Sequence, residues 1–263
     1  MCQPVIRPRK RFGQHFLHDP SVIQRILAAI DPRPGEPLLE IGPGLGALTG
    51  GLLRGAGRLE VVELDRDVIP ELVARVGGEG ELIVHEADAL KVDIAGLAAG
   101  RRLRVCGNLP YNISTPLLFH LLEAAPHIAD MHFMLQKEVV DRMAAGANDE
   151  AYGRLSVMLA VVAEVEPLFI VGPGAFRPPP RVQSAVVRLR PRPAPPFALP
   201  DPARFARIVA NAFNQRRKTL RNSLRGQVDE AGFAAAGIDP IRRAETLTPA
   251  DFGRLAVTAA PPP

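Results

Sequence analysis

The segment Leu38-Leu39-Glu40-Ile41-Gly42-Pro43-Gly44-Leu45-Gly46 decides how the rest of the chain is interpreted. Its first four residues are largely apolar and predict a short buried strand. The glycines that follow at once permit a tight turn and a close approach of the backbone to a ligand. Their spacing is G-x-G-x-G, which differs from the G-x-G-x-x-G of a dinucleotide site. The segment therefore predicts a strand, a ligand-binding turn and then a helix that begins near Ala47.

Strand-like and helix-like segments alternate around this turn. Short apolar runs predict strands, and segments with apolar residues at helical spacing predict helices between them. The expected strands are Leu38–Ile41, Leu59–Asp65, Leu82–His85, Leu103–Cys106, His132–Leu135, Pro167–Val171 and Ser184–Leu189, with Gly107 breaking the fourth. The alternation predicts an α/β fold with a mostly parallel, doubly wound sheet, whose final strands need not be parallel.

A proline-rich segment, Pro191–Pro202, predicts a linker after the last strand. Short helices are expected beyond it, at Ala203–Phe213, Thr219–Leu224, Asp229–Ala236 and near Pro249–Val257. We therefore expect a larger α/β domain over residues 1–190 and a small all-helical domain over residues 203–263.

The composition limits the class of protein. The chain has 263 residues, of which 47% are apolar and 23% charged, as in ordinary soluble globular proteins. No apolar run has the length of a membrane span, and the basic N-terminal segment is not followed by the apolar stretch of a secretory signal. Cys2 and Cys106 have neither metal-ligand nor redox spacing. We therefore expect a cytoplasmic protein that has no metal site and no contact with membranes.

Charge is unevenly distributed along the chain. Glu36–Asp93 holds twelve acidic and five basic residues, whereas Pro202–Arg225 holds seven basic residues and no acidic one. Four further basic residues precede Asp19, again without an acidic residue. An acidic middle with basic flanks indicates a polyanionic partner that is held by the flanks. The alternative is that these runs are solvated surfaces.

Four strand ends carry residues suited to a cofactor: Gly42, Glu63, Asp88 and Asn108, at the edge where parallel sheets bind ligands. Glu63 lies 21 residues beyond Gly42, where a carboxylate accepts the hydroxyls of a ribose. Asp88 is placed to accept from the amine of adenine, while Gly42 and Gly44 allow close backbone approach. An adenosine without a pyrophosphate favours S-adenosylmethionine, whose cation suits the acidic middle of the chain. An NAD site and a purely structural turn are the alternatives.

The segment Asn108-Leu109-Pro110-Tyr111 follows the fourth expected strand. The amide oxygen of Asn108 can accept from an amine, and a carbonyl of Leu109 or Pro110 can accept its second hydrogen. Tyr111 offers a ring face for stacking on a base, and Phe176, in a proline-rich loop, is a candidate for the other face. The segment therefore predicts a clamp that presents an aromatic amine to the methyl donor. A strand end followed by a simple turn is the alternative.

Basic residues near both ends predict contacts with RNA phosphates. The helix expected at Thr219–Leu224, extended backwards, would place Arg217 and Arg221 on one face. The candidate RNA-binding residues are Arg216, Arg217, Lys218, Arg221 and Arg225, with Arg9, Lys10 and Arg11 as a second contact. A solvated basic helix is the alternative.

Together these motifs resemble those of the bacterial small-subunit ribosomal RNA adenine dimethyltransferases, the KsgA/RsmA family. The resemblance extends over nearly the whole chain. The shared motifs are Phe12–Leu17, Glu40–Gly46, Asn108–Thr115, Gln136–Met143, Phe176–Ser184 and Phe213–Leu224.

The resemblance implies a Rossmann-like class I methyltransferase domain and a C-terminal domain that binds RNA or the ribosome. Its implied activity is S-adenosylmethionine-dependent dimethylation of two adjacent adenosines in the 3′-terminal hairpin loop of 16S rRNA, on the immature small subunit, by a monomer. Matched motif by motif, cofactor contacts fall on His15, Leu17, Gly42, Glu63, Asp88 and Asn108. Many relatives have Asn at the position of His15.

Two rival functions stay open from the sequence. One is a 23S rRNA adenine methyltransferase of the antibiotic-resistance type, against which the basic stretch Gln215–Arg225 argues. The other is a non-catalytic assembly factor for the small subunit, against which the complete set of donor-site residues argues.

Overall fold

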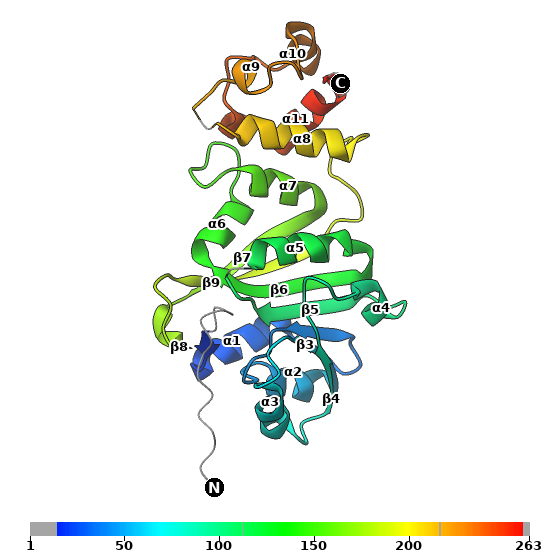
Figure 1. The fold of residues 1–263 in the computed structure, drawn as a ribbon, viewed down its shortest axis with the longest axis vertical. Coiled ribbons are helices and arrows are strands. Elements are labelled where there is room, and N and C mark those ends of the chain that lie inside the picture. The colour runs from blue at the N-terminus through cyan, green and yellow to red at the C-terminus, as the bar shows by residue number, and fades with distance from the viewer. Residues whose placement is uncertain (1–14, 112, 216, 260–263) are drawn as a thin grey trace. The chain divides into compact units, whose positions relative to one another are not determined.

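A computed structural model of the chain describes residues 15–111, 113–215 and 217–259. Its main feature is a seven-stranded sheet in the order β4-β3-β2-β5-β6-β9-β7 (Figure 1). The strands are β2 (Leu38–Ile41), β3 (Arg58–Glu63), β4 (Glu81–Glu86), β5 (Leu103–Asn108), β6 (Ile128–Gln136), β7 (Ala163–Val171) and β9 (Ser184–Pro191). Strands β4, β3, β2, β5 and β6 pair in parallel, whereas β9 is antiparallel to β6. The predicted mostly parallel sheet is therefore confirmed.

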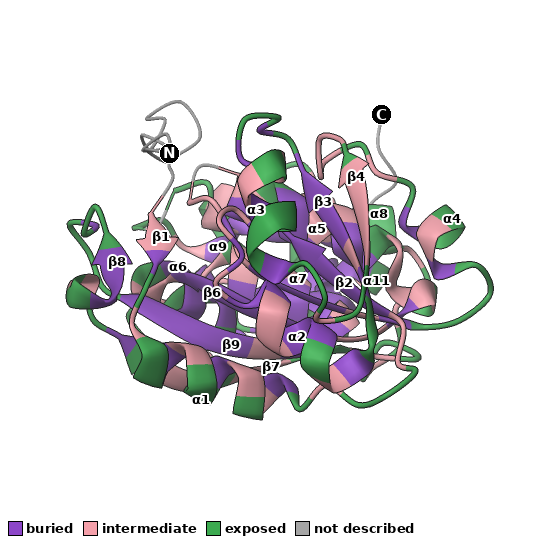
Figure 2. Cartoon of the chain, turned by 90° about the horizontal axis from the view of Figure 1, so that it is seen from below, coloured by how far each residue is buried: buried purple, intermediate pink, exposed green. Residues whose placement is uncertain are grey.

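Three helices close one face of the sheet. Helices α1 (Pro20–Ile30), α2 (Thr49–Ala56) and α3 (Ile69–Val76) bury their apolar stripes in a core that also contains residues of β2, β3 and β5. Helix α5 (Ser114–Glu123) lies on the opposite side of the sheet from α1 (Figure 1). Helices α4 (Ile94–Ala98) and α6 (Lys137–Ala144) complete this part of the chain. Burial is greatest through the middle of the sheet, where β2, β6 and β9 lie (Figure 2).

Asp19 followed by Pro20 predicts a helix start, because Asp caps helices and Pro suits the first helical position, and α1 confirms it. Its carboxylate accepts hydrogen bonds from the backbone N–H groups of Ser21 at 2.8 Å and Val22 at 3.2 Å. Pro20 occupies the first turn, where a missing N–H costs nothing. These bonds satisfy donors that the first turn of a helix otherwise leaves without partners.

The sequence misses a two-stranded sheet formed by β1 (Phe16–Leu17) and β8 (Phe176–Arg177). The two strands pair antiparallel, with Phe16 opposite Arg177 and Leu17 opposite Phe176. Each strand has only two residues, so neither contains the alternation by which a strand is recognised in sequence.

The contacts divide the chain into two compact units. The first, called here the larger unit, combines Met1–Val140 with Glu166–Pro191, and the second, the helical unit, combines Asp141–Val165 with Arg192–Pro263. The helical unit contains α7 (Arg154–Val162), α8 (Pro202–Phe213), α9 (Leu220–Ser223), α10 (Glu230–Ala236) and α11 (Pro249–Thr258). The boundary differs from the predicted one, which placed residues 141–165 in the larger domain.

The core of the helical unit explains this difference. Val157 and Val161 of α7 pack in one apolar cluster with residues of α8, α10 and α11. The hydroxyl of Tyr152, just before α7, donates to the carbonyl oxygen of Leu247 at 2.7 Å. These contacts join segments far apart in sequence, so composition around a linker does not reveal them.

Strand β5 approaches β2 closely at Gly107. The sequence suggested that Gly107 breaks the strand, but β5 continues through it to Asn108, so this expectation is wrong. A Cβ atom at Gly107 would lie 2.3 Å from the carbonyl oxygen of Ile41. Glycine is therefore required by the closeness of two backbones and not by a turn.

We predict that Gly107→Ala lowers the free energy of unfolding by about 2–3 kcal/mol, because overpacking against a strand backbone has little room to relax. Chemical denaturation measures this difference. Gly172→Ala is the matched control, since its Cβ would meet open space at an ordinary φ of −73°. Equal stability of the two variants would contradict the close approach.

His132 of β6 is buried within the sheet. Its side chain is 3% exposed, and Nε2 has no hydrogen-bond partner among the residues that the structure describes. Burial lowers the pKa of His132 to about 4; Asp130, 3.9 Å from Nδ1, opposes this shift, and nearby Arg104 and Arg188 add to it. Because the folded-state pKa is depressed, the unfolded chain binds the extra proton. The neutral ring therefore favours folding above about pH 6.5, and this stability is lost as the pH falls toward 4.

We predict that stability falls on acidification through this window, with His132 contributing on the order of 2 kcal/mol between pH 7.5 and pH 5. Denaturation curves of the wild-type protein and His132→Gln across these pH values measure the contribution. The variant should show a smaller loss, whereas an identical loss would exclude His132 as its source.

Candidate active site

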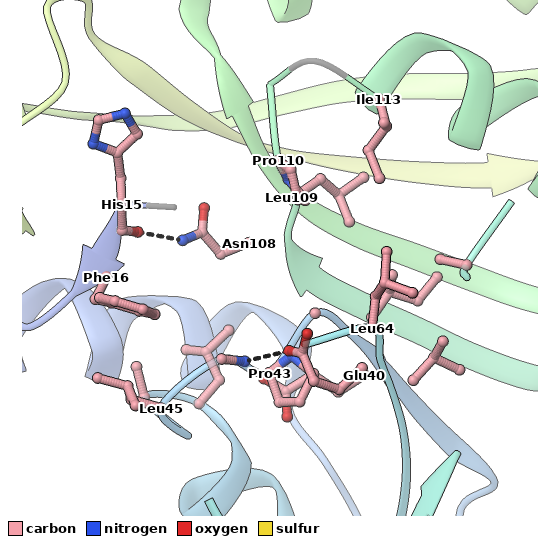
Figure 3. A pocket seen from close by; sticks show the side chains of 18 of the residues that line it. His15, Phe16, Glu40, Pro43, Leu45, Leu64, Asn108, Leu109, Pro110 and Ile113 are labelled. Atoms are coloured by element: carbon pink, nitrogen blue, oxygen red, sulfur yellow. Dashed lines mark hydrogen bonds between the residues drawn. The ribbon is translucent and has the colours of Figure 1, made fainter. Parts of the chain in front are cut away.

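A cavity of about 290 Å³ lies at the carboxyl ends of β2, β3, β4 and β5, beside β1 (Figure 3). This volume is at the lower end of the range for small-molecule sites. Every residue predicted to contact a cofactor lines it: His15, Leu17, Gly42, Gly44, Glu63, Asp88 and Asn108. Leu109, Pro110 and Tyr111 line it as well. The predicted convergence of the strand ends is thus observed, while the contact of each residue with a cofactor stays a prediction.

The glycine turn after β2 has a backbone that side chains rarely permit. Gly42, Gly44 and Gly46 have φ values of 66°, 53° and 79°. A Cβ atom at Gly44 would lie 3.3 Å from the ring of Phe16, and one at Gly46 would lie 2.8 Å from the side chain of Leu72. The turn therefore needs glycine for its conformation and for its packing, and it leaves backbone exposed to the cavity.

Two acidic residues at strand ends are fixed by backbone amides. Glu63, which is 8% exposed, accepts hydrogen bonds from the N–H of Gly44 at 3.1 Å and of Asp65 at 2.9 Å. Burial raises the pKa of Glu63, and these two hydrogen bonds oppose the rise. Asp88, half-buried just beyond β4, accepts from the N–H of Leu90 at 3.0 Å. Each carboxylate oxygen keeps capacity for a further donor such as a ribose hydroxyl or an amine.

Glu40 is a cavity residue whose role the sequence did not reveal. It is 2% exposed, and the hydroxyl of Thr49 donates to its carboxylate at 2.7 Å. Burial raises the pKa of Glu40 to about 7, and the neighbouring Glu63 adds to this rise. A cation bound beside these two carboxyl groups would favour their charged forms and lower both pKa values, so the cavity favours a cationic ligand over an anionic one.

Other missed lining residues are apolar: Phe16, Leu64, Leu90 and Ile113. Leu64 is 51% exposed although it is large and apolar. An apolar residue directly after a strand-end acid was the available signal, because such a position is exposed at the edge that binds ligands.

Asn108 is held through its amide nitrogen. Its Nδ2 donates to the carbonyl oxygen of His15 at 3.2 Å, and in Figure 3 the amide oxygen does not point toward that carbonyl. The backbone N–H of Leu109 donates to Met134 at 3.2 Å, while the carbonyl of Pro110 accepts from Ile113 at 3.2 Å. The Pro110 carbonyl is thus used by a turn, which favours Leu109 as the second acceptor for an amine.

Tyr111 is fixed at both its hydroxyl and its ring. The hydroxyl lies 2.7 Å from Oγ of Ser184, and burial raises its pKa. The ring of His15 stacks on Tyr111 with centroids 5.7 Å apart and planes inclined by 29°. Tyr111 therefore presents a positioned, protonated phenol at the cavity.

Phe176 is not at the cavity in this structure. Its side chain is 2% exposed and packs in the core of the larger unit. Pairing of β8 with β1 places Phe176 opposite Leu17, and both side chains point into that core. The expected stacking position is therefore corrected: the proline-rich loop contacts the cavity residue His15 through Pro178, but the Phe176 ring is turned inward.

The basic stretch has less helix than predicted. Helix α9 begins at Leu220, so Arg217 and Lys218 lie in the preceding turn, and the expectation that Arg217 and Arg221 share a helical face is wrong. The cause is that Leu220 is buried in the helical core and Thr219 takes an extended conformation before it. The predicted contacts that are described, Arg217, Lys218, Arg221 and Arg225, are all exposed. Arg9, Lys10, Arg11 and Arg216 lie outside the described residues.

Arg221 has an acidic partner within the helical unit. Its Nε lies 2.9 Å from the carboxylate of Glu230, and both side chains are more than half exposed. An exposed pair of this kind contributes little to stability and is readily exchanged for a phosphate.

Within the described residues, no three or more His, Cys, Asp and Glu side chains are arranged to hold a metal ion. In the same part of the chain, no helix has the length and apolar character needed to cross a membrane.

The sheet order, the glycine turn and the acidic cavity define a Rossmann-like class I methyltransferase. Residues 5–260 match the model of the ribosomal RNA adenine dimethylase family, and the chain belongs to that family.

Curated relatives and solved structures agree with this assignment. The chain is 58% identical over 251 residues to ribosomal RNA small subunit methyltransferase A of Pseudomonas aeruginosa, which covers 95% of this chain and 94% of that protein. It is 57% identical to the protein of the same name from Methylococcus capsulatus, and the match covers 93% of this chain and 95% of that protein. A dimethyladenosine transferase from Plasmodium falciparum aligns with a TM-score of 0.75 at 25% identity, over 92% of this chain and 96% of that one. The 23S rRNA methyltransferase ErmE aligns with a TM-score of 0.74 at 28% identity, over 92% of this chain and 98% of that one.

We predict that Glu63→Ala weakens binding of S-adenosylmethionine at least tenfold, because a buried carboxylate that accepts hydroxyl groups contributes about 1.5–3 kcal/mol. Calorimetry on the purified protein measures this loss. Glu60→Ala on the same strand is the control, since Glu60 is bonded to His85 at 2.8 Å and does not line the cavity. Equal affinity of the two variants would contradict the predicted ribose contact.

Proposed function

We propose that the protein transfers methyl groups from S-adenosylmethionine to the exocyclic amines of two adjacent adenosines in the 3′-terminal hairpin loop of 16S rRNA, on the small ribosomal subunit. The observation that carries this proposal is the orientation of Asn108, whose amide oxygen is left available beside an acidic cofactor cavity. The chain's membership of the ribosomal RNA adenine dimethylase family supports the reaction and its substrate.

The cavity fits the proposed cofactor in shape and charge. Gly42 and Gly44 expose backbone, Glu63 is placed for a ribose and Asp88 for the adenine amine. Burial raises the pKa of Glu40 and of Glu63, and a sulfonium or ammonium group beside them would favour their charged forms, so the pair suits a cationic ligand. When bound, S-adenosylmethionine supplies an electrophilic methyl group.

Asn108 and Leu109 position the amine that receives the methyl group. The amide oxygen of Asn108 accepts one N–H of the target adenine, and the carbonyl of Leu109 accepts the other. These two hydrogen bonds favour tetrahedral geometry at the amine nitrogen. The nitrogen lone pair then points toward the position of the methyl carbon. After one methyl group has been added, one N–H remains to be held in the same way. Positioning of this kind supplies most of the rate enhancement.

Tyr111 orients the base and does not act as a general base. Its phenol is bonded to Ser184, and burial keeps its pKa above the ordinary value, so it stays protonated at neutral pH. The face of its ring that His15 does not cover is instead proposed to stack against the adenine. The proton of the methylated amine leaves to water after the transfer.

The helical unit is proposed to bind RNA through the exposed residues Arg217, Lys218, Arg221 and Arg225. We further propose that the protein acts as a monomer in the cytoplasm, where ribosomal subunits are assembled in bacteria. The 58% identity to a small subunit methyltransferase, against 28% to a 23S rRNA methyltransferase, favours 16S rRNA as the substrate.

The proposal is tested with undermethylated small subunits and labelled S-adenosylmethionine. Wild-type protein should place the label in N6,N6-dimethyladenosine, which nuclease digestion and nucleoside chromatography identify. We predict that Asn108→Ala lowers turnover at least a hundredfold, since the amine is no longer oriented, while the protein stays folded by circular dichroism. Near-normal turnover of this variant would refute the clamp, and label in 23S rRNA alone would refute the substrate.

We predict that Arg217→Ala combined with Arg221→Ala weakens binding to small subunits and reduces the dependence of log K on log salt by about 1.4–1.8, the loss of two phosphate contacts. Arg243→Ala with Arg254→Ala removes the same charge from elsewhere in the helical unit and serves as the control. A salt dependence equal to that of the control would count against the basic stretch.

A further inference from the structure

The loop between β8 and β9 borders the cavity at both of its ends. Near its start, Pro178 has its carbonyl oxygen 2.8 Å from Nδ1 of His15, and Arg177 pairs in register with Phe16. At its end, Ser184 is bonded to the hydroxyl of Tyr111. His15, Phe16 and Tyr111 all line the cavity, so the last residue of β8 and the loop after it, residues 177–183, called here the rim loop, lie beside the part of the cavity wall that these three residues form.

The rim loop is also held from the side of β6. The backbone N–H of Lys137, directly after β6, donates to the carbonyl oxygen of Gln183 at 2.9 Å. The loop is therefore fixed at several points along its length, and its exposed side chains are carried on a positioned backbone. Arg177 and Arg181 are both exposed.

The charges of the rim loop have no acidic partner among the described residues of the larger unit. The segment from Gly172 to Pro191 contains no acidic residue. Arg188 and Arg190, on β9, both contact the carboxylate of Glu166. By contrast, among the described residues neither Arg177 nor Arg181 forms an ion pair. The two arginines without an ion pair are thus carried by the loop that contacts the cavity residues His15 and Phe16.

We propose that Arg177 and Arg181 bind the phosphates that flank the target adenosine. This inference rests on the proposed function and adds a second RNA contact, at the active site, to the one in the helical unit. When the adenine enters the cavity to reach Asn108, its own ribose and phosphates must stay at the opening. The described residues that line the cavity include Glu40, Glu63 and Asp88 and no Lys or Arg, so positive charge for the phosphates has to come from the rim. Guanidinium groups supply it as paired donors.

The test compares Arg177→Gln/Arg181→Gln with Arg190→Gln/Arg192→Gln. The control removes two charges from the following strand and the residue after it, where each arginine already has a glutamate partner. Binding to undermethylated small subunits is measured over a series of salt concentrations, together with KM for the subunit and the affinity for S-adenosylmethionine. The rim variant should raise the dissociation constant and KM about tenfold or more and reduce the salt slope by about 1.4–1.8.

Three further results complete the test. Affinity of the rim variant for S-adenosylmethionine should equal that of wild type, which shows that the cavity is intact. Arg177→Lys/Arg181→Lys should recover most of the salt slope, which a packing role for the arginines does not predict. A rim variant with the slope and KM of the control would overturn the inference. If the proposed function is wrong, the wild-type protein will not methylate the subunits. The comparison of subunit binding between the rim variant and its control would still decide whether the rim arginines bind RNA.

Discussion

The site depends on the close contact between β5 and β2 at Gly107. A Cβ atom at this position would lie 2.3 Å from the carbonyl oxygen of Ile41, the last residue of β2. This approach brings Asn108 next to the glycine turn that begins at Gly42. The amine-binding group and the cofactor turn are therefore neighbours because two parallel strands end side by side. The sheet alone places Asn108 beside the glycine turn.

The charges around this point are separated in a way that suits a cationic donor and an anionic substrate. Glu40 and Glu63 line the interior, and because burial raises the pKa of both carboxyl groups, a cation beside them is favoured. Arg177 and Arg181 lie outside, on a loop that is tied to cavity residues by Pro178 and Ser184. A sulfonium group is favoured inside, and a phosphodiester chain is favoured at the opening. The arrangement admits the base of a nucleotide while it keeps the backbone out.

Much of the fold and of the site could be predicted from sequence, because these features are local. The strands of the sheet are continuous apolar runs, and the spacing of the glycines in G-x-G-x-G predicts a tight turn. Glu63, Asp88 and Asn108 were found because each follows a strand, and parallel strands end at one edge. The same locality explains why the cap at Asp19 was predicted correctly.

Features that depend on tertiary contacts were missed or misplaced. The pairing of Leu17 with Phe176 joins strands too short to recognise, and it turns the Phe176 ring into the core. Helix α9 starts late because burial of Leu220 determines its position. Helix α7 packs with the C-terminal helices although it precedes the last strand of the sheet. Each outcome is set by a partner distant in sequence, which local patterns do not contain.

The position of Asn108 beside the methyl donor in one cavity is tested most directly by a crystal structure with bound S-adenosylhomocysteine. We expect electron density for the ligand in the cavity, with the ribose hydroxyls on Glu63, the adenine amine on Asp88 and the sulfur facing the amide of Asn108. Ligand density elsewhere, or in this cavity with the sulfur directed away from Asn108, would contradict it.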